Sequence, residues 1–342
     1  MAQLTITPEP VLTADDFIEA LDVAPEGNRV VAASVSGEVI HATRTQQGAW
    51  APTVLTRYNS EATRVQFSPD GNWVAAGGND GVVEIFDASH APVATMKTKG
   101  WCRALAWRPD SQELAAAIGR EVHRFSHSDR PNLVHTDHPT TVECLAWTHD
   151  GKHLGVGTYG GVWWYQGAVQ PLRRFEWTGA LLSLSVSPDG NWAVSGNQDS
   201  SVHCWRLWRK GDELEMTGYP TKVQHLAWDP DGLQLAVGNM GEVTVWPFSG
   251  KGPKGTVPLQ FGDHERHIVG LAYRPTVTNT LATVSADGLL CVWENPSRET
   301  TSPTTTLKFD EEPTALRWKP DGDSILIATA SGNVFEVGYV AS

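Results

Sequence analysis

The chain has 342 residues and carries 39 acidic against 26 basic side chains, for a formal net charge of −13 and a pI near 5.3. A surface of that sign repels phosphate backbones and anionic membranes, so we expect neither a nucleic-acid nor a membrane partner. A chain of this length can bury roughly three-quarters of the surface that its unfolded form exposes, which allows one large domain.

The cysteines and the N-terminus indicate a soluble protein of a reducing compartment. Cys102, Cys144, Cys204 and Cys291 show no CxxC spacing and lie in predicted strands, which favours buried free thiols. The first residues lack a basic start followed by an apolar run, and no stretch approaches the roughly 18 apolar residues of a membrane helix. We therefore expect a cytoplasmic location.

In chain order, a lone strand at residues 3–6 comes first and eight copies of one unit follow it. In the sixth copy, a strand at 226–228 meets the turn Pro230-Asp231-Gly232, a strand at 235–238 follows, and a Gly-centred turn precedes a third strand at 243–246. Proline presets φ at the start of such a turn, and glycine accepts the positive φ that reverses the chain. The first turns of the eight copies lie at Pro25, Pro69, Pro109, His149, Pro188, Pro230, Pro275 and Pro320.

The spacing of these turns predicts the architecture. Successive turns are 44, 40, 40, 39, 42, 45 and 45 residues apart, and a period of about 40–45 residues with four strands per unit is typical of a β-propeller. Fourth strands are visible at 53–55, 92–96, 172–175 and 305–309. We predict an all-β fold with a single eight-bladed propeller over residues 1–342, or seven blades if one weak repeat is not a blade. Because the chain ends on a third strand at 333–337, the N-terminal strand would complete the last blade and remove an open edge.

The seventh copy resembles the WD-repeat family over its full pattern. Gly262-Asp263-His264 precedes the unit, Ser285-Ala286-Asp287-Gly288 follows its second strand, and Trp293 lies in its third. The resemblance implies a hydrogen-bonded brace of His264, Ser285, Asp287 and Trp293 within one blade, and it covers essentially the whole chain. The other copies depart from the full pattern. Two keep a tryptophan at the tryptophan place, Trp205 and Trp246, and the rest hold Ala42, Phe86, Phe125, Tyr165 and Val337 there. With polar partners missing there, we expect stability to come mainly from apolar layers.

The resemblance also implies where a partner would bind, because family members usually bind on the face where the innermost strands begin. Aligning the eight innermost strands on their last residues places two rings of side chains at that face. We expect Trp101, Arg103, Lys222 and His267 to contact a partner. Phe17, Glu61, Glu143 and Glu312 complete the set, and these eight residues are called the rim below. The alternative for Trp101 is that it packs on its neighbouring blade.

These observations predict a non-enzymatic scaffold, monomeric on its own, that binds a protein through aromatic and charged rim residues. The chain has no Gly-x-Ser-x-Gly elbow, no Gly-x-x-x-x-Gly-Lys loop and no His-Glu-x-x-His pair. A propeller enzyme with a site around Arg103 and His267 remains an alternative. The basic loops at 250–255 and 208–211 could dock an acidic partner, but solvated hairpin ends are the simpler interpretation.

Twelve histidines raise the question of metal binding. His264 and His267 are an i, i+3 pair in a loop, and His123, His127, His135 and His138 extend over two strands and a turn. Zinc sites need converging His, Cys or carboxylate ligands, and neither set has a recognisable ligand spacing. We therefore expect solvated loop histidines, no resident metal and no cofactor.

Part of the chain resembles one bacterial branch of the WD-repeat family. The similar segments are 204–207, 216–223, 245–248, 252–253 and 159–164. Members of that branch are often encoded beside CobW-type metal-chaperone GTPases. The resemblance implies an accessory role in zinc homeostasis, with such a GTPase as the partner, and it bears on the cellular setting rather than on mechanism.

Overall fold

A computed structural model describes residues 2–7, 9–126, 133–136, 138–209 and 211–342. These residues form β-strands and contain no helix, so the all-β prediction is confirmed. Within the same ranges, no helix is long and apolar enough to cross a membrane. The chain divides into two compact units, Ala14–Val186 and Met1–Thr13 with Ser187–Ser342, which are called the first and second unit below.

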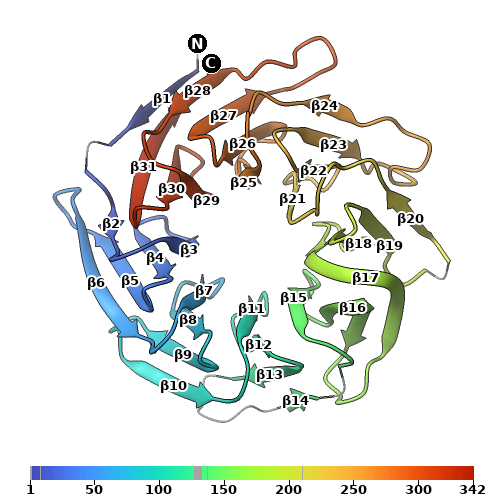
Figure 1. Ribbon diagram of the computed structural model, residues 1–342, viewed down its shortest axis with the longest axis horizontal. Coiled ribbons are helices and arrows are strands. Elements are labelled where there is room, and N and C mark those ends of the chain that lie inside the picture. Colours follow the sequence, from blue (N-terminus) through green and yellow to red (C-terminus); the bar gives the residue numbers. More distant parts are fainter. Residues whose placement is uncertain (1, 8, 127–132, 137, 210) are drawn as a thin grey trace. The chain divides into compact units, whose positions relative to one another are not determined.

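The first unit contains three four-stranded antiparallel sheets and a further set of three strands, all in chain order (Figure 1). The first sheet holds β3 (Ile18–Val23), β4 (Arg29–Ser34), β5 (Glu38–Arg44) and β6 (Trp50–Arg57). The second holds β7 (Ala62–Phe67), β8 (Trp73–Gly78), β9 (Val82–Asp87) and β10 (Pro92–Lys97). The third holds β11 (Cys102–Trp107), β12 (Leu114–Ile118), β13 (Glu121–Phe125) and β14 (Leu133–His135). The last set is β15 (Val142–Trp147), β16 (Leu154–Tyr165) and β17 (Arg173–Val186).

The second unit repeats the same pattern. It begins with β18 (Trp192–Asn197), β19 (Val202–Arg206) and β20 (Glu213–Met216). Two four-stranded sheets follow, β21 (His225–Trp228), β22 (Gln234–Gly238), β23 (Val243–Pro247) and β24 (Leu259–Phe261), then β25 (Ile268–Tyr273), β26 (Thr280–Ser285), β27 (Leu289–Glu294) and β28 (Thr305–Lys308). The last sheet holds β29 (Pro313–Trp318), β30 (Ser324–Thr329) and β31 (Asn333–Val340) together with β1 (Gln3–Ile6) and β2 (Leu12–Thr13).

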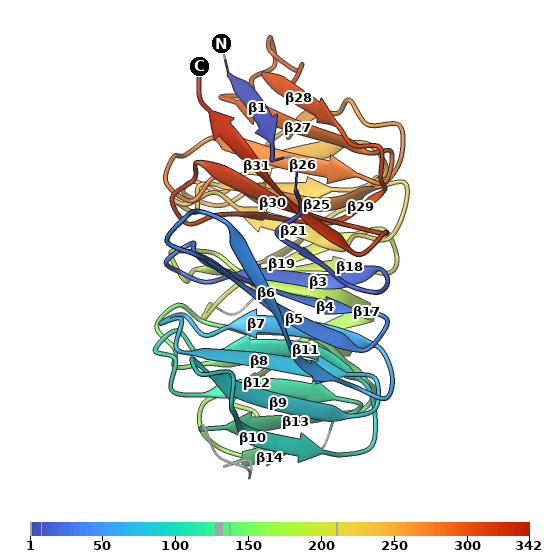
Figure 2. The same cartoon turned by 90° about the vertical axis from the view of Figure 1, so that its left-hand side faces the viewer.

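The N-terminal strand completes the last sheet, as predicted. β1 pairs antiparallel with β31 from Gln3 opposite Val340 to Ile6 opposite Val337, and β2 pairs with the start of β31 at Leu12 and Val334. Figure 2 shows β1 beside β31. The pairing supplies the outer strand that the last triplet lacks, so the edge of β31 is covered.

The number of sheets differs from the predicted eight blades and equals the seven given as the alternative. β17 is one uninterrupted strand from Arg173 to Val186, although the sequence predicts a fourth strand and the innermost strand of the next blade within that stretch. No turn separates the two, so β15 to β20 count as a single six-stranded sheet. The described strands therefore form seven sheets.

The turns between first and second strands follow the predicted chemistry. Gly71 has φ +73° and donates its N–H to Ser68 O at 2.9 Å. Asp70 Oδ1 accepts the N–H of Asn72 at 3.1 Å and so closes the turn. Glycine meets the positive φ without strain, which explains why this residue type recurs in most of these turns, whereas Ser111 takes the same place with φ +63°.

The core lies between neighbouring sheets. In the first unit, Val31 and Val39 of one sheet pack with Phe67, Val74 and Phe86 of the next. The second strand of each sheet is buried on both faces, as the buried run at Val30–Ser34 in β4 illustrates. The residues at the tryptophan place lie on β5, β9, β13, β16, β19, β23, β27 and β31, where they join these apolar layers. All four cysteines are free and buried, as predicted, and burial raises the pKa of Cys102 to about 12.

Candidate functional site

Five rim residues belong to the first unit, and Trp101 is a large exposed one. Its side chain is 60% exposed immediately before β11, a large apolar surface to leave in water. Packing on a neighbouring sheet, the alternative for this residue, does not account for that exposure. Trp101 is thus available for contact with another molecule.

Arg103 and Glu143 lie on neighbouring first strands, β11 and β15, and pair with each other. The guanidinium Nε and Nη2 of Arg103 lie 3.0 Å from Oε2 of Glu143. Arg64 of β7 extends the arrangement, because its Nε donates to Arg103 O at 2.7 Å and its Nη1 lies 3.4 Å from Glu19 of β3. A row of charged side chains therefore links four consecutive first strands. Arg64 was not predicted, since the alignment assigned no role to its position.

A β-bulge explains why these side chains recur at one place. The register shifts at Glu19 in β3, at Thr63 in β7, at Arg103 in β11 and at Glu143 in β15. A bulge leaves one residue without a cross-strand partner and changes the direction of its side chain. In each of these first strands, the bulged residue lies four places before the last residue of the strand. The side chain at that place is therefore not part of the regular cross-strand ladder.

The two other rim residues of the first unit have structural contacts. Glu61 is exposed and accepts the Nδ2–H of Asn79 at 2.5 Å, while its carbonyl accepts the N–H of the same residue at 2.9 Å. Phe17 is half-buried before β3, and its carbonyl accepts the N–H of Val35. The contact of Phe17 uses its backbone alone and Glu61 stays exposed, so both side chains can still contribute to a contact surface.

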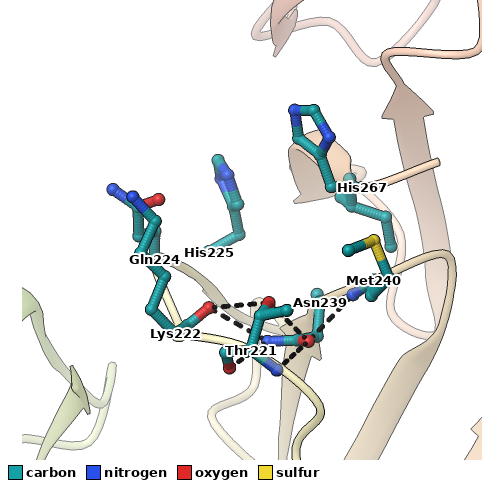
Figure 3. Close-up of a pocket in the computed structure, with 9 residues that line it drawn as sticks. Thr221, Lys222, Gln224, His225, Asn239, Met240 and His267 are labelled. Carbon is teal, nitrogen blue, oxygen red and sulfur yellow. Dashed lines mark hydrogen bonds between the residues drawn. The ribbon is translucent and has the colours of Figure 1, made fainter. Parts of the chain in front are cut away.

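In the second unit, Lys222 and His267 line the same pocket (Figure 3). The pocket has a volume of about 320 Å³ and lies at the beginning of β21 and β25. The complete lining is Thr221, Lys222, Gln224, His225, Gly238, Asn239, Met240, His267 and Ile268. Figure 3 shows the imidazoles of His225 and His267 pointing in the same direction, away from Asn239.

The pocket exists because β21 is short. It begins at His225, whereas β25 has six residues and contains its own bulge. Residues 221–224 are instead held by Asn239, whose amide oxygen accepts from Thr221 N and Oγ1 at 3.2 and 3.0 Å. Its Nδ2 donates to Thr221 O and Lys222 O at 2.9 and 3.1 Å. Asn239, which the sequence analysis missed, therefore fixes the backbone that carries Lys222.

The electrostatics of the pocket are set by burial and by nearby cations. Burial first, and then His267 and Arg317, lower the pKa of His225 to about 4. His225 is therefore neutral at physiological pH and offers one ring N–H and one ring acceptor. Glu312, the last rim residue, lies outside the pocket lining and forms an ion pair with Arg266 at 3.0 Å.

The predicted brace forms only in part, because Trp293 Nε1 and His264 Nδ1 have no hydrogen-bond partner among the described residues. His264 Nε2 lies 2.7 Å from Thr283 Oγ1, not from Ser285. Ser285 donates instead to Arg266 O at 3.0 Å. Asp287 accepts the N–H of Glu265 at 2.7 Å and its Oδ2 lies 3.8 Å from His264 Nδ1, while the rings of His264 and Trp293 meet edge to face at 6.0 Å. Thr283 faces the same side of β26 as Ser285, because side chains alternate along a strand.

The histidines of the β11–β14 sheet were wrongly expected to be solvated. His123, His135 and His138 are buried, and His138 Nε2 lies 3.0 Å from the Tyr165 hydroxyl. His135 packs on the ring of Tyr165 with centroids 3.9 Å apart. These rings fill space between strands, which the sequence pattern did not show. His127 lies outside the described residues.

In the described ranges, no three His, Cys, Asp or Glu side chains form a group that could hold a metal ion. His264, one member of the i, i+3 pair, is engaged by Thr283. His267 lines the pocket described above. His264 and His267 thus lie in two separate environments.

A second pocket, in the first unit, was not predicted. It has a volume of about 400 Å³ and is lined by Tyr159, Trp163, Arg174 and Trp177 among others. Tyr159 is 54% exposed, and the Arg174 guanidinium lies over the Trp163 ring at 3.7 Å. The dense aromatic run at 159–165 was the available signal, but the pocket depends on how β16 pairs with β17.

Two segments match the family described as WD domain, G-beta repeat, at residues 53–87 and 169–206. The chain contains WD40 repeats. These matches and the all-β sheets make the chain similar to WD40 β-propellers, a family of generally non-enzymatic scaffolds that generally bind proteins.

Relatives and solved structures agree with this assignment. Protein HIR1 of Candida albicans is 22% identical over 84% of this chain and 33% of its own length. The serine-threonine kinase receptor-associated protein of Mus musculus is 26% identical over 53% of each chain. The chain thus spans about a third to a half of the length of these relatives. The C-terminal WD40 domain of Sif2 superposes with a TM-score of 0.79 over 98% of both chains at 13% identity, and the designed protein Ika8 with 0.78 at 20%. At these identities, the two structures show the fold alone.

Proposed function

We propose that this chain is a non-enzymatic scaffold that binds a protein partner through its rim residues, acting as a monomer in the cytoplasm. The single observation that carries the proposal is the 60% exposure of Trp101 beside the Arg103–Glu143 pair. Tryptophan and arginine are the residue types that most often dominate protein interfaces. The pocket around Lys222 and His267 supports a contribution from the second unit.

The proposal extends to the architecture. We propose that residues 1–342 form one propeller domain. The support is the eight turns at intervals of about 40–45 residues.

A CobW-type metal-chaperone GTPase is the partner class that the narrower resemblance suggests. The segment 216–223, which carries part of that resemblance, supplies Thr221 and Lys222 to the pocket. The role in zinc homeostasis would then be exerted through this partner. Its presence or absence among captured proteins tests the suggestion directly.

The test is partner capture with a matched pair of triple variants. One variant carries Trp101→Ala, Arg103→Ala and Lys222→Ala. The control carries Trp208→Ala, Arg209→Ala and Lys254→Ala, which removes the same three residue types from exposed positions outside the rim. Both variants must show the far-ultraviolet circular dichroism of the wild type.

The expected result is a protein that is retained by the wild type and the control and is lost from the rim variant. Retention by all three would move the binding surface away from the rim. The absence of any saturable protein partner would overturn the scaffold function itself.

A further inference from the structure

The pocket of the second unit differs in charge from the chain as a whole. The protein has 39 acidic and 26 basic residues, yet the described residues that line this pocket include one lysine, two histidines and no carboxylate. Gln224, His225 and His267 add polar groups that can donate hydrogen bonds. A cation-bearing hollow on an acidic protein favours anionic groups at that place.

The cation in this pocket has no internal partner. Lys222 is exposed, and no described residue forms an ion pair or side-chain hydrogen bond with its ammonium group. Its backbone, in contrast, is held by Asn239 through the hydrogen bond to Lys222 O at 3.1 Å. The charge is therefore available while the backbone that presents it is ordered, which lowers the entropic cost of binding.

The neighbouring imidazoles supply directional contacts. Figure 3 shows the rings of His225 and His267 on the side of the pocket away from Asn239. His225 also experiences the positive charge of Arg317, one cause of its lowered pKa. The Lys222 ammonium would attract an anion placed between it and the imidazoles, and the imidazoles would orient that anion through hydrogen bonds.

We propose that this pocket binds a carboxylate side chain from an acidic segment of the protein partner. The inference rests on the proposed scaffold function and names the chemistry of the partner. At about 320 Å³, the pocket has the size of small-ligand sites and can admit an aspartate or glutamate side chain. The net charge of −13 disfavours long polyanions such as nucleic acids, so a short acidic segment that places one carboxylate in the pocket is the better match.

The experiment uses the full chain labelled with ¹⁵N at histidine and follows the imidazole resonances by NMR. The probe is an acetylated, amidated hexaglutamate peptide, and hexaglutamine is the matched neutral peptide. Both are titrated at 50 mM and at 200 mM salt. Lys222→Gln is the test variant, and Lys254→Gln is the control because it removes an exposed lysine outside the pocket.

We expect hexaglutamate to shift the resonances of His225 and His267 saturably and hexaglutamine to leave them unchanged. Lys222→Gln should weaken binding by up to about fivefold, the range of an exposed ion pair, with Lys254→Gln unchanged. Binding should also weaken at the higher salt concentration. Equal shifts with hexaglutamine, or equal affinities for Lys222→Gln and wild type, would overturn the inference. Inorganic phosphate is titrated in the same way. If it shifts the same resonances saturably, with an affinity at least equal to that of hexaglutamate, the inference is overturned in favour of a small-anion site.

Failure of this inference and failure of the scaffold function give different results. If the captured partner is lost from the rim variant while hexaglutamate does not bind, the scaffold function stands and the carboxylate site is wrong. If hexaglutamate binds in the pocket but no partner is captured, the anion site stands and the scaffold function is wrong.

Discussion

Trp147 donates its indole Nε1–H to the backbone carbonyl of Ala106 at 3.0 Å, joining the first strands β15 and β11. The same bond recurs from Trp107 to Gln66 at 3.3 Å and, in the second unit, from Trp318 to Ala272 at 3.0 Å. In each case the tryptophan ends its strand, and the acceptor lies one residue before the end of the preceding first strand. The indole thus serves both as apolar filling and as a link between sheets.

Trp147→Phe keeps an aromatic ring and removes this donor. The free energy of unfolding should fall by about 1–3 kcal/mol, because the carbonyl of Ala106 loses its partner in a buried place. Urea unfolding measures the change. Trp101→Phe, at an exposed position, should change little, and an equal loss in both variants would contradict a specific role for the bond.

Trp101→Ala should leave the free energy of unfolding within about 0.5 kcal/mol of the wild type, as expected for an exposed site without structural contacts. Chemical denaturation checks this. The same variant should lose captured partner. A loss of stability well above that range would restore the packing role for Trp101 and weaken its assignment to the rim.

Thr283→Val keeps the shape of the side chain and removes the hydroxyl that contacts His264. Both side chains are buried, so the unsatisfied imidazole should lower the free energy of unfolding by about 1–3 kcal/mol. Thr306→Val, on the exposed face of β28, is the matched control. Thermal unfolding of the two variants compares them, and a smaller effect at Thr283 than at Thr306 would exclude the brace contact.

Lys319 and Glu336 form a buried ion pair with Nζ and Oε1 3.0 Å apart. Removing one charge, as in Lys319→Met, should cost about 3–5 kcal/mol because the other charge stays buried. The double variant Lys319→Met with Glu336→Leu should recover much of that loss. A double-mutant cycle from urea unfolding tests this expectation, and strictly additive losses would disprove the coupling.

Stability should fall as the pH decreases from 6.5 towards 4. Burial first, and then His90 and Arg29, lower the pKa of His41 to about 4, below the value of about 6.5 for an unfolded histidine. In that window the unfolded state binds a proton that the folded state does not, which favours unfolding by up to about 3 kcal/mol. Urea unfolding between pH 7.5 and 4 should show a shallower pH dependence for His41→Gln than for the wild type. Parallel curves would mean that His41 does not contribute.

Much of the architecture could be predicted from the sequence because its signals are local. The Pro-Asp-Gly turns, the apolar strands between them and the lone strand at 3–6 need only neighbouring residues to be recognised. The pairing of β1 with β31 was predictable as well, since a chain that ends on a third strand leaves one edge open.

The candidate site was predictable only in part. The alignment placed Trp101, Arg103 and Lys222 at the beginning of first strands or just before them, because position along a strand follows from counting. It missed Arg64 and Asn239, whose roles depend on atoms in neighbouring strands and loops. It also assigned Ser285 a contact that Thr283 makes.

Sequence alone thus determined the repeat, the all-β class and the approximate positions of the rim residues, all of which follow from turn chemistry and strand periodicity. Only the tertiary structure decided that β17 continues without a turn, that β21 starts late enough to open a pocket, and that His135 and His138 are buried. The physical reason is that these features arise from pairing and packing between segments that are distant in the sequence. There, the hydrogen-bond register and the available volume distinguish side chains that the local sequence pattern does not.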